Sequence, residues 1–310
     1  MSVVEQSPRE ELLTPAGSAA SRPRGLTVVI PAYNEEHGIA PVVEQVRGAM
    51  DASGLTYELL VVNDGSRDRT AEAARATGVR VVSHHQNRGY GEALKTGIRN
   101  AAFDSIAIID ADGSYPASEI PKLYSLLDEN EMVVGARTGS NAAIPLIRRP
   151  AKAFLTWLAS YLTGTKIPDL NSGLRLFKRA LAIEFFDLLP SGFSFTTTIT
   201  LSALNSGYNV RFVEVDYYHR TGSSKIRPIQ DTFNFLMLIL RLTLIFRPLK
   251  IYLPLAAWMG VIAICVLLVG WYGFGRIFDN TILVFIEAAL QAAMIGLLAD
   301  VVNVRRSRSP

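Results

Sequence analysis

Two long apolar runs near the C-terminus constrain this chain more than any other feature of its sequence. Residues 251–274 include no charged side chain, and about 24 residues at about 1.5 Å each exceed the roughly 30 Å hydrocarbon thickness of a bilayer. A second run, residues 281–299, contains one ionisable residue, Glu287. Both runs predict membrane-spanning helices, and the short polar break between them predicts a transmembrane hairpin.

Basic residues flank the predicted hairpin at both of its outer ends. Arg247 and Lys250 precede the first run, and Arg305, Arg306 and Arg308 follow the second. Since basic flanks stay on the cytoplasmic side, both ends of the hairpin are expected in the cytoplasm. The N-terminus has no charged-then-apolar leader, so the region before the hairpin and both termini are expected to be cytoplasmic as well.

Glu287 and Gln291 share one face of the second predicted span. A polar pair at this depth either marks a path for lipid or ions or pairs helices between subunits. We expect the second role, and therefore a homo-oligomer.

Composition and charge argue against several classes of function. The net charge of +3 is modest and the basic residues lie beside apolar segments, so the sequence predicts a basic rim facing anionic lipid rather than nucleic-acid binding. The single cysteine excludes an intramolecular disulfide and any cysteine-based metal cluster. Residues 1–24 mix Pro, Ser, Ala and charges without periodicity, which predicts a disordered tail.

From residue 26 onward, short β-rich runs alternate with helix-like stretches. This alternation predicts an α/β domain with a mostly parallel, Rossmann-like sheet, in which ligands bind beyond the carboxyl ends of the strands. The runs expected to be strands are residues 26–30, 57–62, 79–83, 105–109 and 132–134.

Two further segments predict amphipathic helices that lie on the membrane surface. From about Ala143, apolar and aromatic residues fall at helical spacing beside Arg148, Arg149 and Lys152. The second segment, residues 229–248, is apolar nearly all round. The alternative is that both helices pack against the α/β domain. The chain is thus expected to comprise a tail (1–24), an α/β domain (25–228), an interfacial helix (229–248), and two spans with a basic tail (249–310).

Polar side chains follow three of the predicted strands and are expected to line one crevice. Asp110 and Asp112 supply the hard oxygen ligands that Mg²⁺ or Mn²⁺ prefers, and a metal there would bridge a diphosphate. Asp64 is placed either to accept hydrogen bonds from a nucleobase or to cap the following helix. Glu35 is placed either to bind a ribose hydroxyl or to interact with a helix dipole.

Three motifs, in their order and spacing, resemble glycosyltransferase family 2. They are residues 28–36 (Val-Val-Ile-Pro-Ala-Tyr-Asn-Glu-Glu), residues 62–66 (Val-Asn-Asp-Gly-Ser) and the triplet Asp110-Ala111-Asp112. Within that family, residues 87–91, residues 169–175 and the hairpin resemble dolichyl-phosphate mannosyltransferases and bacterial polyprenyl-phosphate glycosyltransferases.

This resemblance runs from about Leu26 to the C-terminus and implies both a fold and a reaction. The implied fold is glycosyltransferase-A-like. The implied reaction is inverting, metal-dependent transfer of a monosaccharide from a nucleotide-diphosphate sugar to a polyprenyl phosphate, which makes a lipid-linked donor for cell-envelope glycan or protein glycosylation. A UDP-sugar is favoured over a GDP-sugar, because the surroundings of the triplet differ from the mannosyl pattern.

The resemblance also implies roles for single residues. Asp110 and Asp112 are implied to bind Mg²⁺ or Mn²⁺. Many relatives place Leu-Gln after the triplet, whereas Gly113 and Ser114 stand here, so a serine hydroxyl or water would replace the Gln side chain and metal preference stays open. The residues implied to hold the donor nucleotide are Pro31, Tyr33, Glu35, Asp64, Asp110 and Ala111.

Basic residues beside the crevice are candidates for binding the acceptor phosphate or the diphosphate, because Arg binds phosphate through a planar bidentate fork. The alternative for Arg148 and Arg149 is to anchor their helix to lipid head groups. Asp169 is the expected assisting carboxylate, and its alternative role is to orient Arg175. The phosphate-binding candidates are Arg137, Arg148 and Arg149, together with Arg220, Ser224 and Lys225 in a segment that resembles the family's closing loop and is otherwise a solvated turn.

Two other functions are open on sequence grounds. A polysaccharide synthase would carry a Gln-X-X-Arg-Trp-like segment and more spans, and the sequence contains neither. A catalytically silent membrane scaffold that binds sugar nucleotides would keep the fold without the chemistry. The intact Asp110 and Asp112 pair argues against the scaffold.

Overall fold

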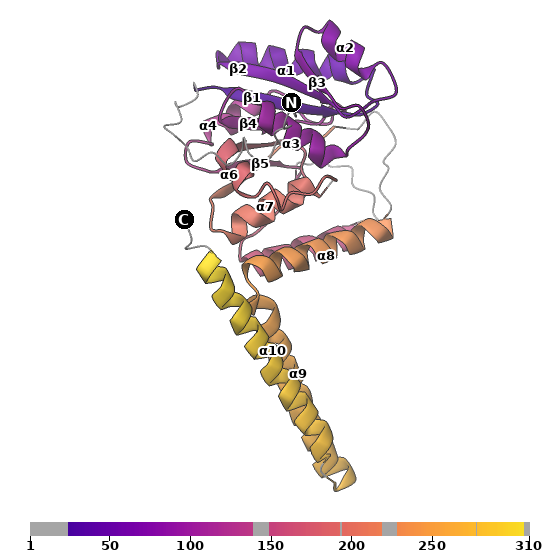
Figure 1. The fold of residues 1–310 in the computed structure, drawn as a ribbon, viewed down its shortest axis with the longest axis vertical. Coiled ribbons are helices and arrows are strands. Elements are labelled where there is room, and N and C mark those ends of the chain that lie inside the picture. Colours follow the sequence, from indigo (N-terminus) through magenta and orange to yellow (C-terminus); the bar gives the residue numbers. More distant parts are fainter. Residues whose placement is uncertain (1–23, 139–148, 193, 219–227, 277, 307–310) are drawn as a thin grey trace, which may run out of the picture.

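The computed structural model places an α/β domain above a long helical hairpin (Figure 1). The sheet and its helices form the upper body, and one helix lies across its underside before the hairpin begins. The structure describes residues 24–138, 149–192, 194–218, 228–276 and 278–306, so the predicted disordered tail lies outside the described residues except for Arg24.

A seven-stranded sheet forms the centre of the domain, in the order β3-β2-β1-β4-β6-β5-β7. β6 runs antiparallel to its neighbours β4 and β5, and every other pairing is parallel. The mostly parallel sheet is therefore confirmed. The strands are β1 (Leu26–Ala32), β2 (Tyr57–Asn63), β3 (Arg80–Ser83), β4 (Ser105–Ile108), β5 (Met132–Ala136), β6 (Arg175–Lys178) and β7 (Val210–Glu214).

Helices cover both faces of this sheet, which explains why its central strands are apolar without a break. Successive side chains of a strand point to opposite faces, so Val28 and Ile30 enter one core and Val29 enters the other. Helices α1, α2 and α4 pack on the first face, and α3, α6 and α7 pack on the second. Their bounds are α1 (Ile39–Ser53), α2 (Thr70–Ala76), α3 (Tyr90–Asn100), α4 (Glu119–Ser125), α6 (Arg179–Glu184) and α7 (Phe195–Asn205).

The antiparallel strand β6 was not among the strands expected from the sequence, and neither was β7. β6 has only 4 residues, too few to show a pattern of its own. Its first residue, Arg175, pairs with Ile108 of β4 and with Val134 of β5. The segment that leads into β6 therefore reaches the edge of the sheet where the parallel strands end.

Helices α5 (Arg149–Thr163) and α8 (Pro228–Phe246) pack beneath the domain and also present apolar side chains outward. One face of each helix enters an apolar cluster with α7, to which Leu162 and Ile239 contribute. The other face of α5 exposes Phe154, Trp157 and Tyr161, whose rings follow one another at 6.1 and 6.0 Å between centroids. Packing against the domain is thus confirmed, and contact with a membrane stays a prediction.

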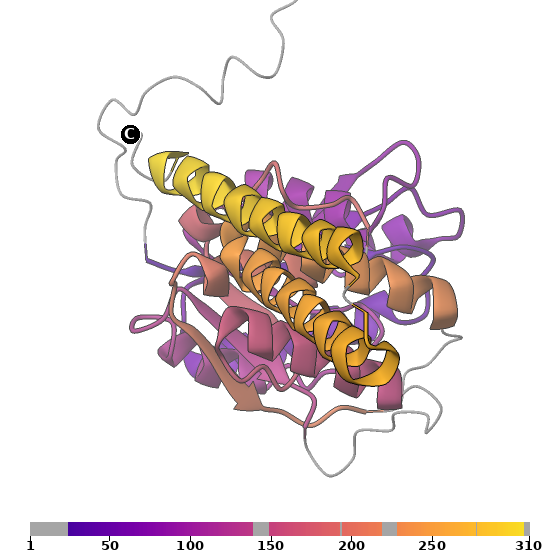
Figure 2. The ribbon, with the colours of Figure 1, turned by 90° about the horizontal axis from the view of Figure 1, so that it is seen from below.

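The two apolar runs form long helices, α9 (Leu249–Phe274) and α10 (Asp279–Arg306). Seen from below, they lie side by side and project from the domain (Figure 2). Both are long and apolar enough to cross a membrane, and only 11% of each apolar window is buried. Such exposure is unlike the core helix of a soluble protein, so the predicted pair of spans agrees with the structure.

Arg247, between α8 and α9, joins the hairpin to the domain. Its Nη1 donates to the carbonyl oxygen of Thr163 at 3.2 Å, and its Nη2 donates to that of Asn205 at 3.4 Å. These residues end α5 and α7, where unpaired carbonyls and the helix dipole favour a cation. The adjacent Phe246 packs edge-on against Phe185 at 6.0 Å. Arg247 was expected only as a basic flank of the span, and the structure adds this structural role.

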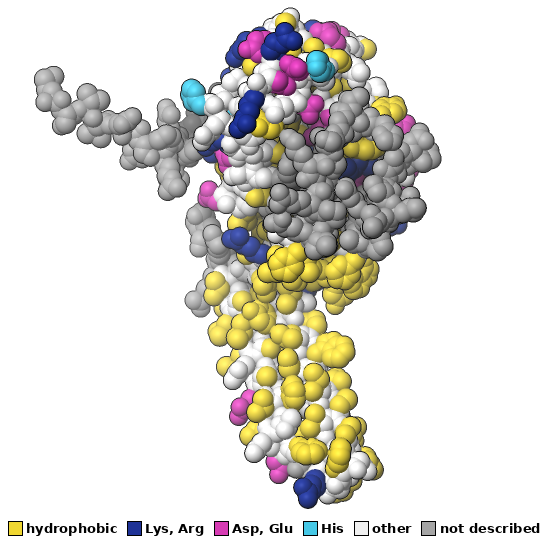
Figure 3. All heavy atoms as spheres, turned by 90° about the vertical axis from the view of Figure 1, so that its right-hand side faces the viewer, with side chains coloured by type: hydrophobic (Ala, Val, Ile, Leu, Met, Phe, Trp, Pro, Cys, Tyr) yellow, Lys and Arg dark blue, Asp and Glu magenta, His cyan; other side chains and the backbone are white. Residues whose placement is uncertain are grey.

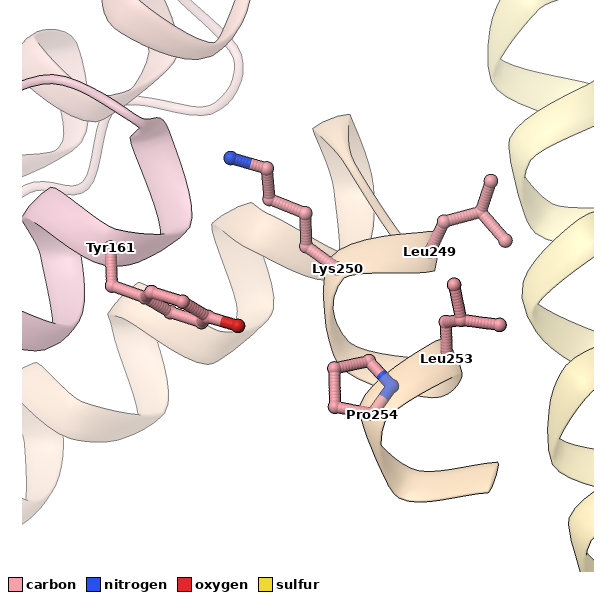
Figure 4. A pocket seen from close by; sticks show the side chains of 5 residues that line it. All are labelled: Tyr161, Leu249, Lys250, Leu253 and Pro254. Carbon is pink, nitrogen blue, oxygen red and sulfur yellow. The ribbon is translucent and has the colours of Figure 1, made fainter. Parts of the chain in front are cut away.

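A groove of about 290 Å³ lies at the same junction, between α5 and the start of α9 (Figure 4). Pro254 has no N–H to donate to the carbonyl of Lys250, which loosens the first turns of α9. The Lys250 side chain extends towards the end of α5, where a Cβ placed on Gly164 would lie 3.5 Å from its Nζ. A second cation therefore lies near the C-terminus of α5. The groove is lined by Tyr161, Leu249, Lys250, Leu253 and Pro254.

Replacing Arg247 tests whether this junction stabilises the fold. Arg247→Met keeps the aliphatic stem but removes both hydrogen bonds to the helix ends, so we expect the free energy of unfolding to fall by about 2 kcal/mol. Thermal unfolding of the detergent-solubilised chain measures the change. Arg241→Met, on the exposed side of α8, is the matched control and should have little effect. Equal effects of the two substitutions would contradict the assigned role.

Candidate active site

The ends of β1, β2 and β4 lie together at one edge of the sheet, as the motif order predicted. Ala32 at the end of β1 pairs with Asn63 at the end of β2. A Cβ placed on Gly38 would lie 2.9 Å from the carbonyl oxygen of Ala111 and 3.4 Å from Glu35 Oε2. The loops after β1 and β4 therefore approach each other closely, and the Glu35 carboxylate lies beside this contact.

Hydrogen bonds to the loop after β2 hold the loop after β1. Asn34, with a φ of 57°, donates its backbone N–H to Ser66 Oγ at 3.0 Å and accepts the N–H of Arg67 at 2.9 Å. The backbone N–H of Glu35 donates to Thr70 Oγ1 at 2.8 Å. These bonds fix the backbone beside Tyr33 and Glu35, whereas Pro31 is buried within β1.

Asp64 is buried and its carboxylate is bound from three sides. Oδ1 accepts from His84 Nδ1 at 2.7 Å and from the N–H of Arg88 at 2.9 Å, and Oδ2 accepts from the N–H of Gly89 at 2.8 Å. These N–H groups precede α3, so the alternative that Asp64 caps the helix following it in the chain, α2, is wrong. His84 Nε2 contacts Thr96 Oγ1 at 2.9 Å. No motif in the sequence pointed to His84, which lies 20 residues from Asp64 along the chain.

The glycines of residues 87–91 allow another loop to cross the start of α3. Gly89 has a φ of 100°, and a Cβ on Gly91 would lie 2.0 Å from the carbonyl oxygen of Pro190. The N–H of Gly91 donates to the carbonyl oxygen of Ser191 at 2.7 Å. Only glycine permits so close an approach at these positions. Tyr90, between them, is thereby held with its hydroxyl towards the site.

Asp110 lies between Tyr90 and Gly173 and closely approaches both. The Tyr90 hydroxyl donates to Asp110 Oδ1 at 2.9 Å, and a Cβ placed on Gly173 would lie 1.9 Å from Oδ2. Burial, and to a smaller extent the Asp110 carboxylate, raise the pKa of Tyr90 well above its usual value, so Tyr90 stays a hydrogen-bond donor. The Tyr115 hydroxyl accepts the N–H of Gly173 at 2.7 Å, which holds the glycine in place.

Asp112 is half-buried and bound by Ser114. The backbone N–H and the hydroxyl of Ser114 both donate to Asp112 Oδ1, at 3.1 and 2.5 Å. In this structure, then, Ser114 supports the carboxylate. That is a different role from the substitute metal ligand that the sequence suggested at this position.

The two carboxylates fit a hard divalent cation. No group of three or more His, Cys, Asp or Glu gathers as a metal site among the described residues. Mg²⁺ nevertheless binds through one or two carboxylates plus substrate phosphates and water, which matches a pair such as Asp110 and Asp112. His84 is not available to this pair, because both of its ring nitrogens contact Asp64 and Thr96.

Asp169 forms a bidentate ion pair with Arg137. Arg137 Nε and Nη2 donate to the two oxygens of Asp169 at 2.6 and 2.9 Å, and the Asp169 side chain is 0% exposed. Burial acts against the charge of Arg137, but its hydrogen bonds to Asp169 and the nearby Tyr115 raise its pKa above the usual value. The ring of Tyr217 lies 5.2 Å from the same guanidinium. Arg137 is therefore a fixed cation at the edge of the crevice.

The alternative role of Asp169, to orient Arg175, stays a prediction, because its carboxylate lies near enough to favour the charge of Arg175. Arg175 is fully buried and donates to neutral acceptors: Nη1 to the carbonyl oxygen of Thr196 at 2.7 Å and to Thr200 Oγ1 at 2.9 Å, and Nε to the carbonyl oxygen of Ser172 at 3.2 Å. Burial lowers the pKa of Arg175 to about 10. Arg175 thus ties the segment before β6 to α7.

Several predicted phosphate-binding residues lie outside the described part of the chain. Arg149 is the first residue of α5, but its side chain is not among those described. Of these candidates, the structure therefore places only the side chain of Arg137. Arg148, Arg220, Ser224 and Lys225 lie outside the described residues altogether.

The family of this chain follows from the region of its sequence that contains most of the candidate site. Residues 27–186 match the model of the family described as "Glycosyl transferase family 2". The chain belongs to glycosyl transferase family 2. The matched region contains β1 from Thr27 onward and β2 to β6, and with them every described side chain of the candidate site except those of Tyr217 and Thr200.

Relatives of this family 2 chain are named as sugar transferases. The "Low-salt glycan biosynthesis hexosyltransferase Agl6" of Haloferax volcanii is 28% identical over 254 residues, 80% of this chain and 60% of the relative. The "Dolichyl-phosphate hexose transferase" of the same organism is 30% identical over 205 residues, 66% of this chain and 87% of the relative. The "Undecaprenyl-phosphate 4-deoxy-4-formamido-L-arabinose transferase" of Edwardsiella ictaluri is 33% identical over 162 residues, and the chain spans 50% of its length.

Solved structures confirm the glycosyltransferase-A-like fold of this family 2 chain. Glucosyl-3-phosphoglycerate synthase from Mycobacterium tuberculosis, crystallised with Mn²⁺, UDP and glucosyl-3-phosphoglycerate, superposes with a TM-score of 0.56. The two sequences are 23% identical, and the match covers 71% of this chain and 80% of the synthase. At that identity the likeness concerns the fold alone.

Removing the charge of Asp169 tests the strength of its pair with Arg137. Asp169→Asn leaves Arg137 without its carboxylate, and breaking a buried pair from one side should lower the free energy of unfolding by about 3 kcal/mol. Denaturant unfolding measures the loss. Asp187→Asn, at an exposed position after α6, is the matched control and should be nearly neutral. A loss below about 1 kcal/mol for Asp169→Asn would show that the pair contributes little.

Proposed function

We propose that this protein transfers a monosaccharide from a nucleotide-diphosphate sugar, a UDP-sugar in preference to a GDP-sugar, to a polyprenyl phosphate, with inversion at the anomeric carbon. One observation carries the proposal. A family 2 crevice holding Asp110 and Asp112 belongs to a domain that continues into two helices able to cross a membrane. A lipid-borne acceptor explains why both are built into one chain, and the names of the dolichyl- and undecaprenyl-phosphate relatives support it.

The donor nucleotide is proposed to lie over the ends of β1, β2 and β4. The carboxylate of Asp64 is held by His84 and by two backbone N–H groups, so it is preorganised to accept an N–H from uracil or guanine. Glu35, fixed through its backbone, is proposed to bind the ribose. The donor nucleotide-binding residues are then Pro31, Tyr33, Glu35, Asp64, Asp110 and Ala111.

Asp110 and Asp112 are proposed to hold Mg²⁺ or Mn²⁺ against the diphosphate. When bound, the cation neutralises negative charge on the departing nucleoside diphosphate. The protein's own part is to keep both carboxylates in place. Tyr90 and Gly173 do so for Asp110, and Ser114 does so for Asp112.

The acceptor phosphate is proposed to bind Arg137, with Arg148 and Arg149 completing a basic rim. Arg137 keeps its charge because its pKa is raised. Its Nε and Nη2 form the bidentate ion pair with Asp169, and Nη1 is not part of that ion pair. Asp169, expected from the sequence to assist catalysis, is proposed to act as a positioning residue for Arg137. Arg220, Ser224 and Lys225 are proposed to contact the diphosphate.

The proposed reaction is one in-line displacement. An oxygen of the acceptor phosphate attacks the anomeric carbon, the bond from that carbon to the diphosphate oxygen breaks, and the nucleoside diphosphate leaves with the bonding electrons. A phosphate monoester is already largely ionised near neutral pH, so positioning and electrostatics can supply most of the catalysis without a strong base. The fixed cation of Arg137 and the supported carboxylates provide such a preorganised site.

The underside of the domain is proposed to rest on the cytoplasmic face of the membrane, with both termini in the cytoplasm. Hydrophobic side chains gather under the domain and continue down the hairpin (Figure 3). Phe154 and Trp157 of α5 and Phe233 of α8 are 49%, 60% and 60% exposed, and aromatic residues favour the level of the lipid head groups. This placement would bring the crevice within reach of a lipid head group.

A transfer assay tests the proposed function. The purified full chain is given radiolabelled UDP- or GDP-sugars, a polyprenyl phosphate, and Mg²⁺ or Mn²⁺. We expect label in the organic-extractable lipid, lost with EDTA and reduced about 100-fold or more by Asp112→Asn, because charge stabilisation at the leaving group is removed. Asp128→Asn, on the exposed loop after α4, is the matched control and should retain activity.

The other outcomes of this assay identify the alternatives. Measurable nucleotide binding without transfer from any donor would overturn the proposal in favour of a catalytically silent scaffold. Label in a growing polymer rather than in a lipid monosaccharide would instead indicate a polysaccharide synthase.

Replacing Trp157 tests the membrane role of α5. Trp157→Ala removes an exposed aromatic ring, so we expect transfer to a long-chain polyprenyl phosphate in vesicles to fall about 10-fold through weaker docking. The KM for the donor sugar should not change. Trp157→Phe keeps an aromatic ring and should restore most of the rate. A loss that is equally large with a short, water-soluble phosphate acceptor would contradict membrane docking.

A further inference from the structure

Helix α10 uses a face of small residues to pack against α9. Ala292 is 8% exposed, and a Cβ placed on Gly296 would lie 2.7 Å from Tyr252 Cβ of α9. Small residues at such a contact let two helices approach closely inside a membrane. The direction of α9 as seen from α10 is therefore fixed by Ala289, Ala292 and Gly296.

Glu287 and Gln291 lie on the opposite side of α10. Each is two residues from Ala289, which corresponds to about 200° of rotation at 3.6 residues per turn. Both side chains are exposed in the structure. In the described part of the chain, neither makes a hydrogen bond or an ion pair. The same side of the helix continues through Met294 and Leu298, which are 61% and 65% exposed.

This placement is costly if the face meets lipid tails. At about 1.5 Å per residue, Glu287 lies about 12 Å and Gln291 about 18 Å along α10 from Asp279, well within a hydrocarbon layer of roughly 30 Å. Hydrocarbon offers no hydrogen-bond partner to a carboxyl or an amide group. Some other group must therefore cover this face.

We propose that the outer face of α10, formed by Glu287, Gln291, Met294 and Leu298, binds the same face of a second copy of this chain. Two copies in one membrane share an orientation, so these residues lie at equal depth in both. A carboxyl group and a primary amide are complementary, since the amide N–H groups donate to a carboxyl oxygen. Across a two-fold axis, Glu287 of each copy reaches Gln291 of the other, and both pairs are satisfied at once.

The geometry allows these reciprocal bonds. Glu287 and Gln291 are four positions apart on the helix, a difference in depth of about 6 Å, which two long side chains can bridge from either end. Met294 and Leu298 extend the contact by further turns and supply the packing surface. A polar pair within an apolar seam also fixes the register of the two helices, as a single Asn does in a coiled coil. The inference goes beyond the proposed function and does not depend on it.

Cysteine cross-linking in native membranes tests this interface. Cys265 is the only cysteine of the chain, so Cys265→Ser gives a background free of thiols. In it, Met294→Cys places a thiol on the proposed face, and Ile295→Cys places one about 100° away on the same helix. We expect oxidation to join two chains at least 5-fold more with Met294→Cys than with Ile295→Cys. Equal cross-linking at both positions would overturn the proposal.

The polar pair itself is tested in the same background. Glu287→Leu combined with Gln291→Leu should lower cross-linking through Met294→Cys at least 5-fold and release single chains in nanodiscs, as measured by particle mass. Leucine suits a lipid-facing position, so the hairpin should still insert. Glu287→Gln keeps an amide partner and should preserve the paired state.

A wild-type chain that is monomeric, or that carries only lipid or a different membrane protein on this face, would overturn the inference. Cross-linking and particle mass do not require catalysis. A failure of the interface is thus distinguishable from a failure of the transfer assay.

Discussion

The antiparallel pairing of β6 between β4 and β5 is the constraint on which the candidate site depends. Every other pairing in the sheet is parallel, so only β6 begins at the edge where the remaining strands end. The segment before it, which contains Asp169 and Gly173, is thereby carried into the crevice. A parallel strand in the same place would deliver this segment to the opposite edge. Asp110 would then lose its contact with Gly173, and Arg137 would lose its carboxylate partner.

Helix α7 extends this arrangement from the site to the side of the domain from which the hairpin projects. In its first half, Thr196 and Thr200 accept hydrogen bonds from Arg175, and at its end the carbonyl of Asn205 accepts one from Arg247. All residues of α7 are buried, so the helix is held by packing along its whole length. The crevice and the start of the hairpin are therefore attached to the two ends of one rigid element. For a transferase with a lipid acceptor, such an attachment would set the height of the site above the membrane.

Much of this molecule follows from local sequence signals. The central strands are apolar runs buried on both faces, and the two spans are long apolar segments, so both can be recognised without knowledge of their partners. The strands β6 and β7 escaped prediction because they are short and their pairing is decided far along the chain. The bond between Asp64 and His84 joins residues 20 positions apart across β3, and no spacing rule connects them. Arg247 looked like a lipid-facing flank because the helix ends it binds become neighbours only after folding.

The site residues show the same division. The motifs predicted which loops meet, since the carboxyl ends of parallel strands share one edge of the sheet. They did not predict which oxygen of each carboxylate is already engaged. Asp64 and Asp169 are buried and bound by protein groups, whereas Asp112 is half-buried and accepts hydrogen bonds from Ser114. A carboxylate that directly contacts substrate phosphate or metal must keep part of its surface accessible. Burial therefore favours Asp110 and Asp112, both half-buried, over Asp64 and Asp169 for the proposed contact with metal or phosphate, which agrees with the proposed positioning role of Asp169.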